Sequence, residues 1–212
     1  MESTGTQPEQ TTHFTELAPN AALLVIDVQK GFGNPSLLAL GRSNPAAEEN
    51  IRALLDAWQD AGRPVVFVRH SSLEPGSPLH PDTPGNELQD FVEKRRTAEG
   101  RRGPEVLIEK TVNSAFIGTP DLADWLEAQG IRQLVTAGIQ TNRCVETTAR
   151  MGGNLGYDVV VPIDATYTFG DTGPGGEHLT ADELSLATAV NLHGGGFARV
   201  VSTAEVLAAL GG

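Results

Sequence analysis

The chain has 212 residues and a formal net charge of −12, since 27 acidic side chains outnumber 15 lysines and arginines. This balance argues against a main function in binding nucleic acid or an anionic membrane, because either would require a basic face. No apolar run reaches transmembrane length and residues 1–20 lack a signal-peptide core, which predicts a cytoplasmic protein. The single cysteine, Cys144, excludes an intrachain disulfide and a metal site built from several cysteines.

Apolar strand-like segments alternate with amphipathic helical segments from residue 21 onward. The predicted strands are 21–28, 64–68, 105–109, 133–137, 157–163 and 198–201, and the predicted helices are 45–61, 121–130, a helix starting near 143, 182–192 and 203–210. Thr203 is the predicted cap of the last helix. This alternation predicts an α/β fold with one doubly wound parallel sheet of six strands and helices on both faces.

Two further regions complete the predicted organisation. Residues 1–20 form an N-terminal tail, which we expect to be largely disordered, and residues 21–212 form one domain. The proline-rich segment 71–85 follows a strand and is predicted to be a long loop in the wall of a pocket. The glycine-rich stretch 170–176 is predicted to be a loop without a nucleotide role, because it lacks the strand–turn–helix context of a phosphate-binding motif.

Three chemically active residues are predicted at the carboxyl ends of strands, where ligands bind in open α/β sheets. Asp27 closes the first strand, Lys110 closes the third, and Cys144 follows the fourth at the start of a helix. A helix start favours a thiolate, so we expect the pKa of Cys144 to be lowered. The alternative is that Cys144 only packs in the core and Lys110 only forms an ion pair with Asp27.

Together these residues predict nucleophilic catalysis. Cys144 would attack, while Asp27 would take the thiol proton and later give it to a leaving group. Lys110 would keep Asp27 in its carboxylate form and favour the thiolate.

The sequence resembles the isochorismatase-like cysteine hydrolase superfamily over about residues 21–205. The resemblance rests on an ordered set of segments: Leu24–Gln29 with Phe32; Lys110 with Asn113–Phe116; Gly138, Thr141, Cys144, Val145, Thr148 and Ala149; Gly156–Val159; and Asp164 with Ala165. It implies the strand order 3-2-1-4-5-6 and an Asp27–Lys110–Cys144 triad. It also implies a cis peptide at Ile139–Gln140 and an oxyanion site formed by the backbone N–H groups of Gln140 and Cys144.

The same resemblance implies a hydrolase that cleaves a C–N bond of a small amide, ureido or carbamoyl compound through a thioester. Nicotinamidases of the superfamily carry an Asp-x-His metal motif after the second strand. Here the segment is Arg69–Ser72, which speaks against a zinc or iron site and against nicotinamide as substrate. We therefore expect no metal and no cofactor. True isochorismatases, which cleave a vinyl ether, lack the cysteine, so the presence of Cys144 argues against that reaction. Vinyl-ether hydrolysis by Asp27, with Cys144 as a bystander, is the alternative reaction, and an inactive binding or assembly relative is the non-enzymatic alternative.

The expected partners are a small-molecule substrate and further copies of the chain, as a dimer or tetramer. The residues expected to contact the substrate are Phe32, His70, Asn113, Phe116 and Tyr167.

Overall fold

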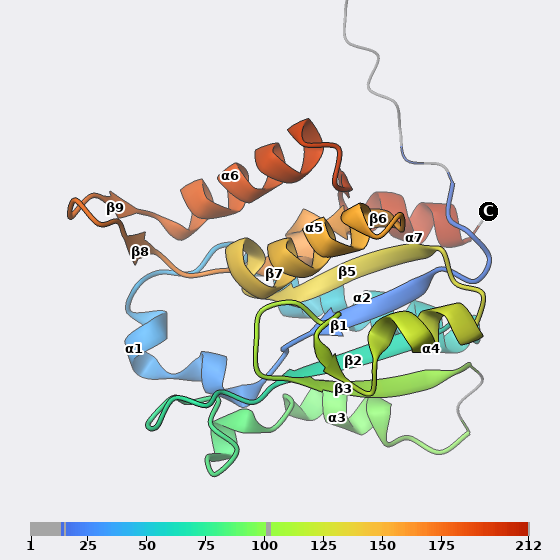
Figure 1. Cartoon of the computed structure of the whole chain (residues 1–212), viewed down its shortest axis with the longest axis horizontal. Helices are drawn as coiled ribbons and strands as arrows, with labels where there is room; N and C mark the ends of the chain where they lie inside the picture. The colour runs from blue at the N-terminus through green and yellow to red at the C-terminus, as the bar shows by residue number, and fades with distance from the viewer. Residues whose placement is uncertain (1–13, 15, 101–102, 212) are drawn as a thin grey trace, which may run out of the picture.

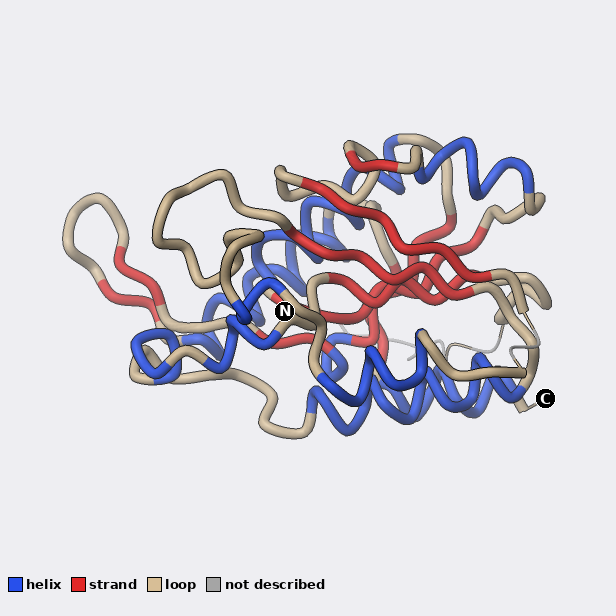
Figure 2. Tube along the Cα trace, turned by 90° about the horizontal axis from the view of Figure 1, so that it is seen from below, coloured by secondary structure: helices blue, strands red, loops and turns tan. Residues whose placement is uncertain are grey.

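The computed structural model describes residues 14, 16–100 and 103–211, and these form a sheet with helices on both faces (Figures 1 and 2). The six main strands are β1 (Ala22–Ile26), β2 (Val65–His70), β3 (Glu105–Lys110), β5 (Gln133–Ile139), β6 (Asp158–Pro162) and β10 (Arg199–Val201). They are parallel and lie in the order β3-β2-β1-β5-β6-β10. The predicted fold class and strand order, 3-2-1-4-5-6, are confirmed.

Short strands that sequence analysis did not predict extend this sheet. A two-residue strand, β4 (Gly118–Thr119), runs antiparallel to β3 at the edge, and β7 (Thr166–Tyr167) pairs with the end of β5. The predicted loop 170–176 was partly wrong, because β8 (Asp171–Thr172) and β9 (His178–Leu179) form a separate antiparallel ribbon there. The glycines at 173, 175 and 176 lie in the turn between these two-residue strands, so the composition of the segment indicated only a loop.

The helices pack in two layers. The helices are α1 (Pro35–Leu38), α2 (Ala47–Asp60), α3 (Asp90–Arg96), α4 (Leu122–Ala128), α5 (Glu146–Asn154), α6 (Ala181–Gly194) and α7 (Thr203–Leu210). Ile51, Leu54 and Leu55 of α2 join one hydrophobic cluster, whereas α4 and α5 contribute to a second. Along β1, Leu23 and Val25 face the first cluster and Leu24 and Ile26 face the second, which explains why this strand is continuously apolar.

The end of the predicted tail is ordered on the domain. Phe14 is buried beneath the guanidinium of Arg199, and the Ala18 N–H donates to Gln133 Oε1 at 2.7 Å. Residues 14 and 16–20 of the predicted tail therefore belong to the described part of the chain, whereas residues 1–13 and 15 lie outside the described residues. Apolar packing by Phe14 supplies an anchor that a mostly polar segment does not reveal by its average composition.

Two local details position the ends of the chain elements. The cap of α7 is Ser202, not Thr203, because Ser202 and Glu205 form a reciprocal capping box. Gly138, the second-last residue of β5, has φ +135°, and a Cβ there would lie 2.0 Å from the Ile26 carbonyl oxygen. Only glycine permits this close approach of β5 to β1 next to Asp27.

Within the described part of the chain, no helix is long and apolar enough to cross a membrane.

Candidate active site

The carboxyl edge of the sheet gathers the three residues predicted to form the triad. Asp27 directly follows β1, Lys110 is the last residue of β3, and Cys144 lies in a π-helical turn, η3 (Thr141–Val145), between β5 and α5. Asp27 has φ +52°, a left-handed conformation that aspartate tolerates better than most side chains. The cis peptide bond implied by the resemblance is present at Ile139–Gln140, immediately before this turn.

Asp27 and Lys110 form a fully buried ion pair. Lys110 Nζ donates to Asp27 Oδ2 at 2.6 Å, and both side chains are inaccessible to solvent. The other carboxylate oxygen, Oδ1, is buried and has no hydrogen-bond partner among the described residues. A buried oxygen without a hydrogen-bond partner lowers the stability of the fold, and a catalytic role is one explanation for such a group. Here Oδ1 is available to accept a proton.

His70 gives Lys110 a second partner at the end of β2. In the sheet register His70 lies beside Lys110, and its Nδ1 is 3.2 Å from Lys110 Nζ. An ammonium group can only donate, so Nδ1 accepts and any proton of the neutral ring resides on Nε2. Burial and the charge of Lys110 lower the pKa of His70, which keeps the imidazole neutral near neutral pH. His70 therefore orients the ammonium group of Lys110. Sequence analysis expected His70 to contact the substrate and did not predict this contact.

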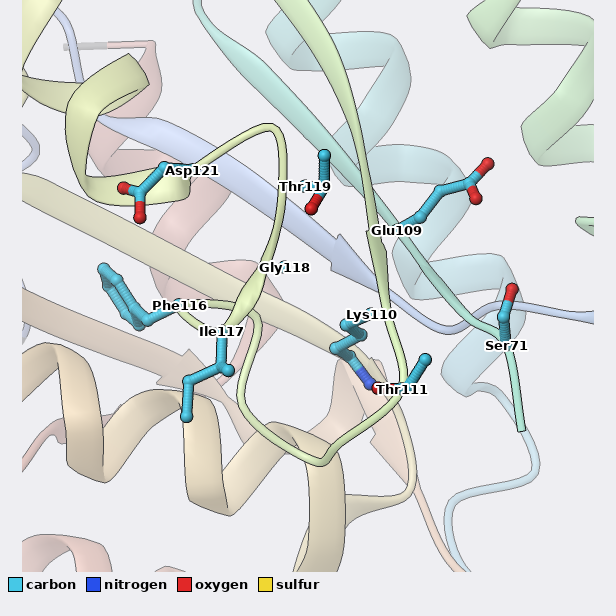
Figure 3. A pocket seen from close by; sticks show the side chains of 9 residues that line it. All are labelled: Ser71, Glu109, Lys110, Thr111, Phe116, Ile117, Gly118, Thr119 and Asp121. Carbon is cyan, nitrogen blue, oxygen red and sulfur yellow. The ribbon is translucent and has the colours of Figure 1, made fainter. Parts of the chain in front are cut away.

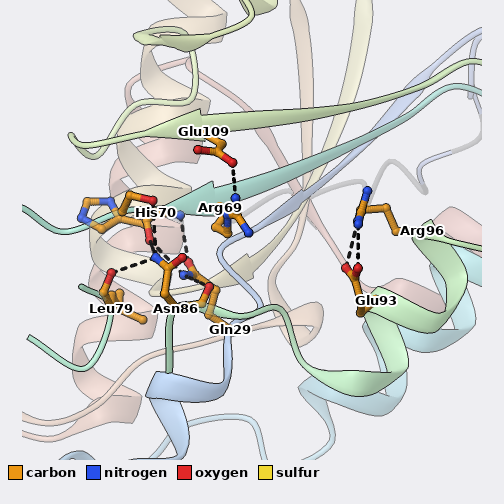
Figure 4. A network of polar contacts seen from close by, with 9 residues as sticks. Gln29, Arg69, His70, Leu79, Asn86, Glu93, Arg96 and Glu109 are labelled. Atoms are coloured by element: carbon orange, nitrogen blue, oxygen red, sulfur yellow. Dashed lines mark hydrogen bonds and ion pairs between the residues drawn. The ribbon is translucent and has the colours of Figure 1, made fainter. Parts of the chain in front are cut away.

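Two buried amide side chains hold His70 in place (Figure 4). Gln29 accepts from the His70 N–H and donates to the His70 carbonyl, both at 2.9 Å, and it also donates to the Asn86 carbonyl at 2.8 Å. Asn86 in turn donates to the carbonyls of His70 and Leu79. This network fastens the loop after β2 to the strand end. Sequence analysis named Gln29 only as part of the Leu24–Gln29 segment and gave it no role, and it missed Asn86.

The pKa of the Cys144 thiol is raised, so the expected lowering was wrong. The residue is 8% exposed, and burial together with the negative charge of Asp27 raises the pKa of Cys144 to about 12, although Lys110 acts in the opposite direction. Removal of the thiol from water outweighs both the nearby ammonium and the helix start. Cys144 therefore rests as a thiol and needs a base to take its proton.

The residues expected to contact substrate divide into two groups. Asn113 is exposed and its Oδ1 lies 3.7 Å from Cys144 Sγ, and His70 is half-buried beside Lys110. The three aromatic residues are instead almost fully buried: Phe32 stacks near Phe169, Phe116 packs against Tyr157, and Tyr167 lies under Arg42. Aromatic residues near an active-site motif and aromatic residues of the core have the same appearance in sequence.

A cavity of about 530 Å³ lies along the sheet edge formed by β3 and β4 (Figure 3). Its lining includes Ser71, Glu109, Thr111 and Asp121, as well as Lys110. Asp27 and Cys144 do not line it, and the Lys110 side chain is inaccessible. The cavity therefore borders the site without reaching the thiol.

The acid, imidazole and thiol also form a possible set of metal ligands. One potential ligand atom from each of Asp27, His70 and Cys144 lies within 4.8 Å of the others. However, Lys110 Nζ is hydrogen-bonded to Asp27 and contacts His70 Nδ1, so an ammonium already supplies positive charge among these donors. A divalent ion beside this ammonium would meet direct repulsion, and the donor set does not fit a metal.

We therefore expect exhaustive chelation to leave any hydrolytic activity and the thermal unfolding midpoint unchanged. The measurement compares protein treated with a chelator, with and without added zinc, manganese or iron, and determines bound metal by elemental analysis. Lost activity that one of these metals restores, with about one equivalent bound, would contradict the expectation.

The protein has a doubly wound α/β sheet, and a buried acid, ammonium and thiol lie near the point where the strand order reverses. Such a group of ionisable side chains at this position is typical of the active site of an enzyme. Residues 21–192 match the isochorismatase domain, and the chain belongs to the isochorismatase family. It is 36% identical over 186 residues to the uncharacterized family protein YrdC of Bacillus subtilis, covering 88% of this chain and 94% of that protein.

Relatives with named activities are more distant. Nicotinamidase 3 of Arabidopsis thaliana is 30% identical over 203 residues, covering 91% of this chain and 90% of that protein. Others are named streptothricin hydrolase and ureidoacrylate amidohydrolase. A crystal structure of an isochorismatase-family protein from Chromobacterium violaceum shares 38% identity with a TM-score of 0.85, covering 95% of this chain and 99% of that one. The predicted family is confirmed.

Proposed function

We propose that the protein is a cysteine hydrolase that cleaves a C–N bond of a small amide, ureido or carbamoyl compound through a thioester. The observation that carries this proposal is the buried Asp27–Lys110 ion pair beside the single cysteine, with one carboxylate oxygen unpartnered. The names nicotinamidase and ureidoacrylate amidohydrolase among the relatives support the same bond class.

In the first half of the reaction, Cys144 Sγ attacks the substrate carbonyl carbon while Asp27 takes the thiol proton. The raised pKa of the thiol makes this transfer necessary, and the Lys110 ammonium offsets the negative charge that moves onto sulfur. The backbone N–H groups of Gln140 and Cys144 would stabilise the oxyanion. As the tetrahedral intermediate collapses, Asp27 returns the proton to the leaving nitrogen, which departs as an amine or ammonia and leaves a thioester.

In the second half, Asp27 takes a proton from water as the water oxygen attacks the thioester carbon. Collapse of this intermediate breaks the C–S bond, and the proton returns to the Cys144 sulfur. Lys110 keeps its charge throughout, and His70 keeps the ammonium aimed at Asp27 through its Nδ1. The same Asp27 therefore acts as base and acid in both halves.

The experiment incubates the protein with a panel of small amide, ureido and carbamoyl compounds, including nicotinamide and ureidoacrylate. We expect released amine or ammonia for one class and an acyl or carbamoyl adduct on Cys144 by mass spectrometry after acid quenching. Vinyl-ether cleavage of isochorismate that persists in Cys144→Ala would support ether hydrolysis instead. No turnover of either class by a protein whose thiol alkylates normally would favour the inactive relative.

Thiol alkylation tests the electrostatics without a known substrate. Because the pKa of Cys144 is raised to about 12, the iodoacetamide rate should rise about tenfold per pH unit from about pH 7 to pH 10. Lys110→Met removes the charge that favours the thiolate, so it should slow alkylation by a similar factor at every pH in this range. Lys30→Met is the matched control, since it removes an exposed lysine paired with Glu87 and Asp90. A wild-type rate that levels off below about pH 8 would contradict the raised pKa.

A further inference from the structure

Asn113, in the loop between β3 and β4, accepts the hydrogen of the resting Cys144 thiol. Cys144 Sγ donates to Asn113 Oδ1 at 3.7 Å, and among the described residues the Asn113 side chain has no other hydrogen-bond partner. A protonated thiol has one hydrogen to donate, so the amide oxygen and not the amide nitrogen faces it. Asn113 is exposed whereas the thiol is nearly buried, so a molecule arriving from solvent can contact this amide.

The loop that carries Asn113 is fastened to α5, the helix that follows the nucleophile turn. The Ala115 N–H donates to Thr148 Oγ1 of this helix at 3.1 Å. Ser114 Oγ donates to Met151 Sδ of the same helix at 3.0 Å. Ser114 and Ala115 are both buried. The backbone next to Asn113 is therefore fixed relative to the thiol, whereas the amide at the end of its side chain is free to change its partner.

Two oxygen atoms compete for the thiol hydrogen. Asp27 Oδ1 is buried without a hydrogen-bond partner among the described residues, and a carboxylate oxygen of Asp27 lies within 4.8 Å of Cys144 Sγ. This carboxylate is the base of the proposed reaction, but the thiol hydrogen is directed to Asn113. Deprotonation by Asp27 therefore requires the hydrogen to leave Asn113 Oδ1, and a second donor at that oxygen favours this change.

We propose that Asn113 Oδ1 exchanges the Cys144 thiol for the N–H group of the scissile nitrogen, and so selects substrates whose scissile nitrogen carries a hydrogen. This inference rests on the proposed function. When the attacked carbon lies about 3–3.5 Å from sulfur, the nitrogen bonded to it is within reach of an oxygen that is itself 3.7 Å from sulfur. The amide N–H is a stronger donor than S–H and replaces it at Asn113. The S–H group then turns to Asp27 Oδ1, which takes the proton.

The exchange couples substrate binding to deprotonation of the thiol and defines a substrate class. Primary and secondary amides, ureido compounds and carbamoyl compounds with such a hydrogen fit Asn113. Compounds with an ester oxygen in place of the scissile nitrogen have no hydrogen to donate and leave the thiol bound to Asn113.

The resting hydrogen bond is tested in the substrate-free protein. Because the chain has one cysteine, its Raman spectrum has one S–H stretching band. Asn113→Leu keeps the size of the side chain and removes the acceptor, so it should move this band to higher frequency and speed alkylation by iodoacetamide about two- to fivefold. Asn113→Asp should slow alkylation about fivefold, because a carboxylate next to sulfur raises the pKa of the thiol. Asn154→Leu, at an exposed asparagine at the end of α5, is the matched control and should have the wild-type band and rate.

Substrate selection is tested with the compound that the panel identifies and its analogue with oxygen in place of the scissile nitrogen. Asn113→Leu should lower kcat/KM for the nitrogen compound about tenfold, mainly through KM, and should leave kcat/KM for the oxygen analogue within about twofold of wild type. Equal losses for the two compounds would overturn the exchange. So would an S–H band that does not move in Asn113→Leu, or slower alkylation of that variant, which would mean that the amide nitrogen faces the sulfur.

Failure of the exchange is distinguishable from failure of the proposed function. In each of those three outcomes, turnover of a nitrogen compound by the wild type still supports the cysteine hydrolase. A wild type that turns over no compound of the panel would refute the proposed function and, with it, the selection of an N–H group by Asn113.

Discussion

Cys144→Ser should reduce turnover at least about 1,000-fold and leave the fold intact. The substitution changes one atom in a nearly buried side chain, so packing is preserved. A serine hydroxyl is harder to deprotonate than a thiol, and the Asp27 carboxylate that suffices for the thiol would not activate it. The measurement compares kcat on the substrate that the panel identifies, together with the thermal unfolding midpoint of wild type and variant.

Two controls separate a chemical role from a structural one. Cys144→Ala should lose turnover to the same extent, because it removes the nucleophile without adding a hydroxyl. Asn113→Ala alters an exposed side chain next to the sulfur and should change KM more than it changes the formation of the adduct. Retention of more than about a tenth of wild-type kcat by either Cys144 variant, in a folded protein, would refute the nucleophile assignment.

Lys110→Met should lower the free energy of unfolding by about 3–5 kcal/mol, because it leaves the Asp27 carboxylate buried without its positive partner. Asp27→Asn should be destabilising for the converse reason, since it leaves the ammonium without a carboxylate. These losses are a large fraction of the total stability of a domain. The measurement is denaturant unfolding at neutral pH, followed by tryptophan fluorescence and circular dichroism.

The double variant Asp27→Asn/Lys110→Met makes this prediction specific to the pair. With both charges removed, no buried ion is left uncompensated, so the double variant should be more stable than Lys110→Met alone. Lys30→Met, which breaks exposed ion pairs, should change stability little. If the single-variant losses simply add in the double variant, the buried pair does not act as a unit and the prediction is wrong. The wild type and the double variant remain measurable if a single variant fails to fold.

The sequence by itself determined the fold. The apolar run of β1 and the regular alternation of strands and helices were sufficient for a parallel sheet, because such strands must bury both faces. The strand ends then identified Asp27, Lys110 and Cys144 as neighbours, since parallel strands deliver their carboxyl ends to one edge. The exact ends of helices were predicted less well. The cap of α7 is Ser202, but Thr203 was predicted, because both serine and threonine side chains can cap a helix.

Only the tertiary structure decided the electrostatic state of the site. The pKa of Cys144 is raised because distant segments exclude water from the thiol and place a carboxylate beside it, and a pattern at a helix start contains neither effect. The contact of Lys110 with His70 and the support of His70 by Gln29 join residues about forty positions apart. Local sequence specifies which groups reach the sheet edge, whereas desolvation and hydrogen-bond partners depend on every chain segment packed around them.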